Sequence, residues 1–166
     1  MTGFTTPGVV ARYDFRSPED SRWSIYRTTL VKNLNPDDFI VEQVWYKSKD
    51  GTRVPMFIVR HKSTKLDGTA PAIQYGYGGF SLSVNPFFSP SMLTFLQKYG
   101  AVLAVPNIRG GAEFGEEWHL GGTKERKVDC SRSLSIQQFE MLFEGQLFRR
   151  LYRCNVSTTD PKMSAD

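Results

Sequence analysis

Three glycines surround one tyrosine in the segment Gly76-Tyr77-Gly78-Gly79-Phe80, which follows a short apolar run. Glycine turns of this kind have two standard chemical uses. They cradle a phosphate, or they let the backbone turn sharply beside a reacting atom. The phosphate-binding patterns G-x-G-x-x-G and G-x-x-x-x-G-K-[ST] do not fit, because the glycines stand too close together and no lysine follows. The spacing therefore favours the second use over nucleotide binding.

A tyrosine held between glycines can donate its hydroxyl proton to a developing negative charge. In α/β-hydrolases the loop after the third sheet strand lies beside the nucleophile and supplies part of the oxyanion hole. Tyr77 is therefore a candidate oxyanion donor. The alternative is that Tyr75 and Tyr77 are core aromatics and that the glycines only form a turn. The residues alone leave both interpretations open.

The segments around this loop predict a βαβ unit. Residues 71–76 precede the glycines as a short apolar run, residues 90–99 place apolar side chains at helical spacing, and residues 101–106 are continuously apolar. Ser89 is a suitable N-cap and Gly100 a suitable helix end. We therefore expect residues 71–76 and 101–106 to be adjacent parallel strands, bridged by a helix over residues 90–99.

An antiparallel hairpin is predicted upstream of this unit. The Asp50-Gly51 pair lies between two runs rich in Val, Ile, Tyr and Phe. Such a pair is a strong short-range hairpin signal, so residues 41–47 and 53–60 should pair. Pro55 indicates that the second strand lies near a sheet edge or begins irregularly.

Composition and charge are those of an ordinary globular protein. The 166 residues are 40% hydrophobic and 23% charged, with a formal net charge of +4. Basic and acidic residues are interspersed, as in KERKVD, which indicates a solvated mixed surface and no nucleic-acid partner. The N-terminus lacks a signal-peptide pattern, and no run approaches about 18 apolar residues. We therefore expect no membrane partner and a cytoplasmic protein.

The sequence offers little for metal or cofactor binding. Cys130 and Cys154 are too far apart for a C-x-x-C pair, and the chain has only two histidines, His61 and His119. We expect reduced thiols, no metal site and no cofactor.

Residues 129–166 differ in texture from the rest of the chain, because they contain very few glycines. Apolar side chains fall on one helical stripe, which predicts a helical tail; they are Phe139, Leu142, Phe143, Leu147 and Leu151. The last dozen residues are typical of a frayed terminus.

Two stretches carry a resemblance to a known family. These are SKDGTRVPMFIVRHKSTKLDGTAPAIQYGYGGFSLSVNPFF and GAVLAVPNIRGGAEFGEEWHLGG. They resemble the start of the catalytic domain of prolyl oligopeptidase (prolyl endopeptidase), and the resemblance runs from about Arg12 to Val128. It implies a serine peptidase in which a seven-bladed β-propeller caps an α/β-hydrolase domain and short peptides are cleaved after proline.

The resemblance also implies a domain division and two site residues. Residues 1–22 correspond to the end of the propeller and the return linker, residues 23–128 to the opening strands of an incomplete α/β-hydrolase sheet, and residues 129–166 to a divergent tail. Tyr77 matches the family's oxyanion tyrosine. Phe80 matches an aromatic contributor to the substrate pocket.

The departures from the family pattern concern the catalytic triad. The family's nucleophile lies in a G-x-S-x-G elbow, and no serine here has glycine at both flanking positions. The nearest approach, residues 79–83, fails at its last position. His119 precedes the place of the serine in chain order, so we interpret it as structural, beside Trp118. Arg109, Glu113 and Glu116 could be an acid/base cluster, but in the family their loop is structural.

Three functional interpretations follow. The chain is a partial, truncated or mis-spliced product of a serine oligopeptidase gene, inactive alone and related to an enzyme that takes short proline-containing peptides. Alternatively it is a non-catalytic binding or regulatory fragment that pairs with a homologue, or an unrelated small α/β binding domain. In the hydrolase strand order the strand at 71–76 would become an unpaired apolar edge, which predicts self-association.

Overall fold

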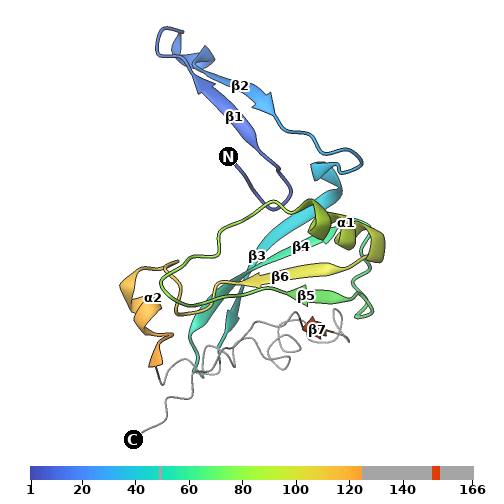
Figure 1. Ribbon diagram of the computed structural model, residues 1–166, viewed down its shortest axis with the longest axis vertical. Coiled ribbons are helices and arrows are strands. Elements are labelled where there is room, and N and C mark those ends of the chain that lie inside the picture. Colours follow the sequence, from blue (N-terminus) through green and yellow to red (C-terminus); the bar gives the residue numbers. More distant parts are fainter. Residues whose placement is uncertain (49, 125–150, 154–166) are drawn as a thin grey trace, which may run out of the picture.

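The computed structural model describes residues 1–48, 50–124 and 151–153. They form a two-stranded sheet and a five-stranded sheet with few helices (Figure 1). The smaller sheet pairs β1 (Val9–Tyr13) with β2 (Trp23–Thr28) in antiparallel fashion. This hairpin stands away from the larger sheet in Figure 1, and every residue of β2 is exposed. The expected division after residue 22 falls between its two paired strands.

The larger sheet has the strand order β3-β4-β6-β5-β7. Its strands are β3 (Phe39–Lys47), β4 (Arg53–His61), β5 (Ala72–Gln74), β6 (Val102–Pro106) and β7 (Leu151–Arg153). The pairs β3–β4 and β4–β6 are antiparallel, whereas β5 runs parallel to both β6 and β7. The sheet is therefore mixed, with β6 at the change of direction.

The predicted hairpin is confirmed as β3 and β4. The register runs from Phe39 opposite His61 to Lys47 opposite Arg53. In the turn the Thr52 amide donates to the Asp50 carboxylate at 3.1 Å, and Gly51 has a φ of 83°. The positive φ explains the glycine, since other residues rarely adopt it.

Of the two alternatives expected from Pro55, the sheet edge is wrong, because β4 lies between β3 and β6, whereas an irregular start agrees with the β6 pairing. The ladder between β4 and β6 begins at Met56, one residue after the proline. The Pro55 carbonyl accepts a hydrogen bond from the Asn107 amide at 2.9 Å, just past the end of β6. The N–H that Pro55 lacks therefore falls just outside the β4–β6 ladder, where no ladder hydrogen bond is lost. This makes proline tolerable in an interior strand.

The predicted βαβ unit is confirmed. Helix α1 (Pro90–Tyr99) begins after Ser89, whose hydroxyl accepts from the Met92 amide at 3.3 Å. It ends at Gly100, which has a φ of 59°. Strand β5 pairs in parallel with β6, although it is shorter than the predicted range of residues 71–76.

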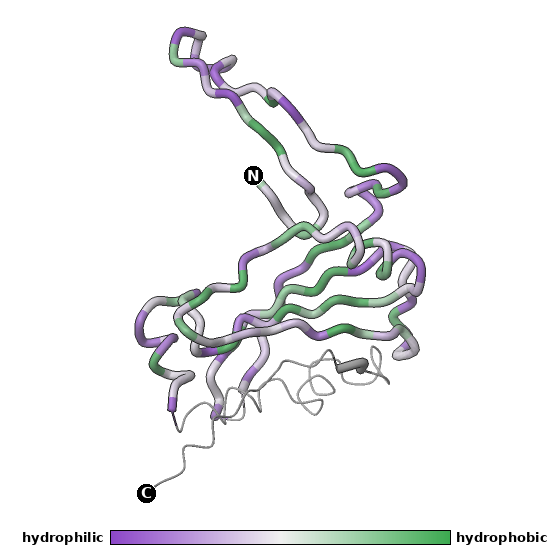
Figure 2. Tube along the Cα trace, viewed as in Figure 1, coloured by the Kyte–Doolittle hydropathy of each residue, from purple (hydrophilic) through white to green (hydrophobic). Residues whose placement is uncertain are grey.

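The core lies on both faces of the five-stranded sheet, and all five residues of β6 are buried. Figure 2 shows the hydrophobic character of these strands. One cluster includes Tyr46, Val54, Met56, Ile58, Val102, Ala104 and Ile108; the other includes Phe4, Phe39, Val59, Leu93, Leu96, Leu103 and Val105. The second cluster holds α1 against the sheet through Leu93 and Leu96.

The outer side of β5 is not the unpaired edge that was expected, because β7 pairs with it. Residues Ala72, Ile73 and Gln74 lie opposite Leu151, Tyr152 and Arg153. Leu151 therefore begins a strand and does not end a helical stripe. The other residues of that stripe, together with both cysteines, lie outside the described residues.

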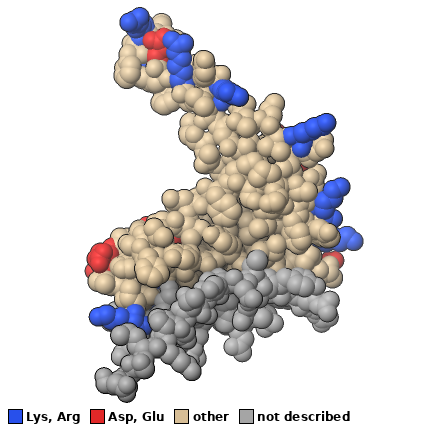
Figure 3. Space-filling view, viewed as in Figure 1, with Lys and Arg blue, Asp and Glu red and all other residues tan. Residues whose placement is uncertain are grey.

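The surface and the helices add two observations. On the face shown in Figure 3, Lys and Arg side chains are scattered and do not form one patch. No helix within the described residues has the length and apolar character needed to cross a membrane.

Candidate functional site

The glycine loop leaves the sheet at the carboxyl end of β5. The Tyr75 amide still donates to the Ala104 carbonyl on β6, at 2.9 Å, and the chain turns away after it. Gly76 and Gly78 are buried, whereas Tyr77 between them is 41% exposed. In the described part of the chain the Tyr77 hydroxyl has no hydrogen-bond partner. Tyr75 is also exposed, so neither tyrosine is a core aromatic.

Gly78 is required by a close backbone approach. A Cβ atom there would lie 2.2 Å from Cγ1 of Ile108 and 2.9 Å from the Arg109 carbonyl oxygen, and its φ is 59°. Gly110 faces it, since a Cβ on Gly110 would lie 2.2 Å from the Gly78 carbonyl oxygen. Two glycines therefore let the loop rest directly on the segment that follows β6, which fixes the backbone immediately after Tyr77.

Phe80 and Ser81 continue the loop in an unusual conformation. Their φ values are 51° and 56°, in the left-handed region that non-glycine residues seldom occupy. The Ser81 amide donates to the Gly110 carbonyl at 3.1 Å, and this bond helps to hold the strained pair. Phe80 is 85% exposed, so its ring is available for contact. Residues in such strained positions cluster at functional sites.

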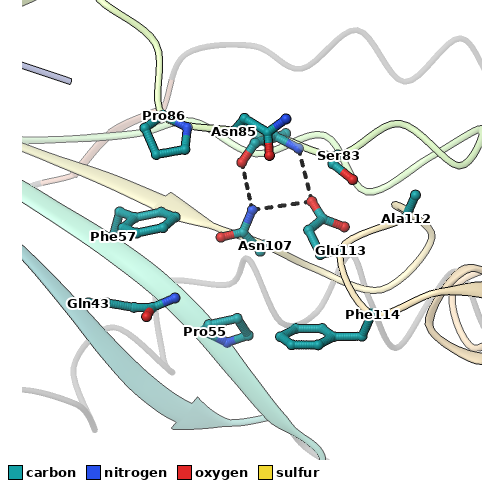
Figure 4. Close-up of a pocket in the computed structure, with 11 residues that line it drawn as sticks. Gln43, Pro55, Phe57, Ser83, Asn85, Pro86, Asn107, Ala112, Glu113 and Phe114 are labelled. Atoms are coloured by element: carbon teal, nitrogen blue, oxygen red, sulfur yellow. Dashed lines mark hydrogen bonds between the residues drawn. The ribbon is translucent and has the colours of Figure 1, made fainter. Parts of the chain in front are cut away.

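A second segment, residues 107–122, supports the loop through hydrogen bonds to Val84. The Glu113 carboxylate accepts hydrogen bonds from the Val84 amide at 3.0 Å and from Asn107 Nδ2 at 3.2 Å. Asn107 Nδ2 also donates to the Val84 carbonyl at 2.8 Å (Figure 4). Sequence reasoning did not assign Asn107 a role, because nothing in the local sequence indicates a contact with Val84.

A pocket of about 270 Å³ adjoins these hydrogen bonds. Its wall is formed by Gln43, Pro55, Phe57, Ser83, Val84, Asn85, Pro86, Asn107, Ala112, Glu113 and Phe114 (Figure 4). The pocket is lined by β3, β4, the end of the glycine loop and the segment after β6. Strand β7 pairs with β5 on the side of β5 that faces away from β6.

The histidines do not form a nucleophile–base pair with the loop. His119 Nδ1 donates to the Gly110 carbonyl at 2.9 Å, which supports the structural interpretation of this residue. His61 contacts the Ser63 hydroxyl at 2.7 Å, but these residues form an exposed turn after β4. Because β4 is antiparallel to β6, that turn lies at the opposite end of the sheet from Tyr77.

Arg109 is also structural in this arrangement. Its Nη1 lies 2.6 Å from Oδ2 of Asp50, in the turn between β3 and β4. Burial raises the pKa of Asp50, but hydrogen bonds from Thr52 and Arg109 outweigh it, so the pKa lies below its ordinary value. Glu116 is exposed, in α2 (Glu116–Leu120). The described residues contain no group of three or more His, Cys, Asp or Glu side chains suited to hold a metal.

The chain is similar in sequence to fungal and bacterial peptidases. It is 68% identical over 130 residues to prolyl oligopeptidase A of Galerina marginata, a match that covers 78% of this chain and 18% of that protein. It is 70% identical over 129 residues to the dual function macrocyclase-peptidase POPB of the same fungus, covering 78% and 18%. It is 41% identical over 127 residues to a prolyl endopeptidase of Elizabethkingia miricola, covering 76% and 17%.

Comparison with solved structures also finds prolyl oligopeptidases. Prolyl oligopeptidase B from Galerina marginata, bound to a 35mer hydrolysis and macrocyclization substrate, matches with a TM-score of 0.85 and 60% identity. That match covers 92% of this chain and 22% of the solved chain. The matched segment belongs to the prolyl oligopeptidase family.

This chain matches only a small part of each relative's length, so family membership is shown for the matched segment alone. The chain spans about a fifth of the length of the prolyl oligopeptidases that it matches. No protein-family model matches it. The predicted resemblance is confirmed, and the roles of Tyr77 and Phe80 stay predictions.

Proposed function

We propose that this chain carries the oxyanion loop of a serine oligopeptidase, with Tyr77 as the oxyanion donor and Phe80 as a substrate contact. The observation that supports this most directly is the exposed Tyr77 hydroxyl, which has no hydrogen-bond partner among the described residues, on a backbone that Gly78 fixes against Ile108. Preorganised donors of this kind stabilise the charge that develops when a nucleophile attacks a carbonyl. In the chain printed above, no G-x-S-x-G elbow accompanies the loop.

The proposal gives the segment a role within a longer enzyme and none alone. The sheet from β3 to β6 would be the opening part of an α/β-hydrolase domain, with residues 1–22 as propeller remnant and linker and residues 129–166 as a divergent tail. The substrates would be short proline-containing peptides, cleaved in the cytoplasm by the longer enzyme. No cofactor takes part in this chemistry, because hydroxyl and amide donors suffice to stabilise an oxyanion.

A chimera tests the proposal. Residues 23–128 of this chain replace the matching segment of prolyl oligopeptidase A from Galerina marginata, and cleavage of a proline-containing chromogenic peptide is followed. Tyr77→Phe should lower kcat by about 10²–10³-fold while leaving KM nearly unchanged. Tyr75→Phe is the matched control and should retain activity. An unchanged kcat in Tyr77→Phe would refute the assignment.

A non-catalytic binding role is the second proposal, and the β1–β2 hairpin favours it. Its exposed side chains include the large apolar residues Phe15, Trp23, Ile25 and Tyr26. Exposed apolar patches of this kind mark interaction surfaces. The chain would then associate with a full-length homologue, and copurification of the two proteins would be lost after replacement of Trp23 and Ile25 by Ser.

A further inference from the structure

One carboxylate ties the two segments of the candidate site together. Glu113 Oε1 accepts from the Val84 amide, at the far end of the loop that begins with Tyr77, and from Asn107 Nδ2, directly after β6. Asn107 Nδ2 in turn donates to the Val84 carbonyl, so Val84 is held through both of its backbone polar groups (Figure 4). The contact joins residues 29 positions apart.

The burial of this cluster makes its hydrogen bonds strong. Asn107 is 4% exposed, and Glu113 Oε2 is buried without a partner among the described side chains. Hydrogen bonds to a carboxylate are roughly twice as strong as those between neutral groups, and low local polarity strengthens them further. The Glu113 carboxylate therefore restrains the loop more firmly than a neutral side chain would.

Gly111, two residues before Glu113, leaves space for the Glu113 carboxylate. A Cβ atom on Gly111 would lie 2.1 Å from Glu113 Oε2 and 2.9 Å from the Leu82 carbonyl oxygen. The φ of Gly111 is not positive, so alanine there is free of backbone strain and would act only by displacing these two groups. Leu82 belongs to the loop that begins with Tyr77, and Glu113 belongs to the segment that supports this loop.

We propose that Glu113 and Asn107 are positioning residues that hold the loop of Tyr77 in the geometry needed for oxyanion binding. This inference rests on the proposed function of Tyr77. The hydrogen bonds of both side chains go to Val84 and to each other, which suits a positioning role. They act by fixing Val84, and an oxyanion donor that is displaced by about 1 Å loses much of its effect on rate.

The full chain provides the first test, which does not depend on catalysis. In Glu113→Ala the Val84 amide should exchange with deuterium at least about tenfold faster, because a buried donor loses its acceptor. In Glu113→Gln, which keeps a neutral amide oxygen as acceptor, exchange should be faster than in the unmodified chain but clearly slower than in Glu113→Ala. Glu117→Ala is the matched control, since that side chain is exposed on α2. Unchanged Val84 exchange in Glu113→Ala would overturn the proposal.

The chimeric enzyme provides the second test. Glu113→Ala and Gly111→Ala should each lower kcat by about tenfold or more with little change in KM, and Glu113→Gln should retain more activity than Glu113→Ala. In a Tyr77→Phe background Glu113→Ala should have almost no further effect, because it acts through Tyr77. Full additivity of the two changes would overturn the positioning role. If Tyr77→Phe itself is silent, the proposed function fails, and the Val84 exchange result still decides whether the restraint exists.

Discussion

Arg109 Nη1 lies 2.6 Å from the carboxylate of Asp50, and this ion pair joins the β3–β4 turn to the glycine-rich segment after β6. The Arg109 side chain is only 12% exposed, and in the described residues its Nε and Nη2 have no hydrogen-bond partner. A mostly buried guanidinium that depends on one carboxylate is costly to leave unpaired. The pair is therefore a stability determinant of the site's support.

Replacing Asp50 with Asn should destabilise the fold through Arg109. The amide oxygen can still accept from the Thr52 amide, so the change removes mainly the charge. We expect the free energy of unfolding to fall by about 1–2 kcal/mol, the lower part of the range for charged hydrogen bonds, because Asp50 is 36% exposed. Urea denaturation measures the change. Asp20→Asn, at an exposed position, should have no effect.

The same pair should give the fold an acid-sensitive component. The pKa of Asp50 is lowered in the folded state, because hydrogen bonds from Thr52 and Arg109 outweigh the opposing effect of burial. A lowered pKa adds stability that is complete above the ordinary value of 3.8 and is lost as the pH falls through the folded value. The stability difference between the unmodified chain and Asp50→Asn should therefore shrink below about pH 4. A difference that is constant from pH 6 to pH 3 would contradict this.

Gly78→Ala should destabilise the fold by more than the cost of placing alanine at a positive φ. Gly78 and Gly100 share a φ of 59°, but a Cβ on Gly100 meets nothing within 4 Å, whereas a Cβ on Gly78 meets Ile108 and the Arg109 carbonyl. Gly100→Ala should cost about 1 kcal/mol of unfolding free energy, and Gly78→Ala about 2–4 kcal/mol. Equal costs in urea denaturation would show that the loop can move away from Ile108.

The chain by itself should be catalytically silent. Oxyanion stabilisation lowers the barrier only for an attack that a nucleophile delivers, and the printed sequence has no G-x-S-x-G elbow. We expect no cleavage of a proline-containing chromogenic peptide and no labelling by a fluorophosphonate. If labelling did occur and disappeared in Ser81→Ala or Ser83→Ala, a nucleophile outside the family pattern would be present.

Self-association should depend on whether β7 covers β5. Proline at position 152 removes a backbone donor from the strand that pairs with Ala72–Gln74, and so uncovers the outer side of β5. Tyr152→Pro should shift the chain towards oligomers in analytical ultracentrifugation, while Tyr152→Thr, which favours strands, should not. If the unmodified chain is already as oligomeric as Tyr152→Pro, β7 does not protect this edge.

The elements that the sequence predicted well are those whose determinants are local. Ser89 and Gly100 mark the ends of α1 within one residue, and Asp50-Gly51 sets the β3–β4 turn. The parallel pairing of β5 with β6 followed from the strand–helix–strand order, because such connections place the two strands in one sheet. The exposure of Tyr77 agrees with the catalytic interpretation of the glycine loop, and its role as oxyanion donor stays a prediction.

The features that the sequence did not predict depend on distant contacts. Pro55 indicates an edge strand until the end of the β6 ladder is known to fall beside it. Glu113 could be grouped with acid/base residues until its bonds to Val84 and Asn107 are seen. The pairing of β7 with β5 was equally hidden, since helical periodicity extended through Leu151 and only Gly145 argued locally against a helix.

The position of β6 in the sheet has a consequence for synthesis. Strand β4 ends at His61, whereas its buried neighbour β6 ends at Pro106, about 45 residues later. At about 5–20 residues per second, a ribosome needs roughly 2–9 s to make that stretch. During this interval the β3–β4 hairpin can form, but Met56, Ile58 and Val59 have no β6 to cover them. Residues 107–122, which support the loop of Tyr77, emerge later still, so during synthesis the apolar side chains of β4 are exposed to non-native contacts.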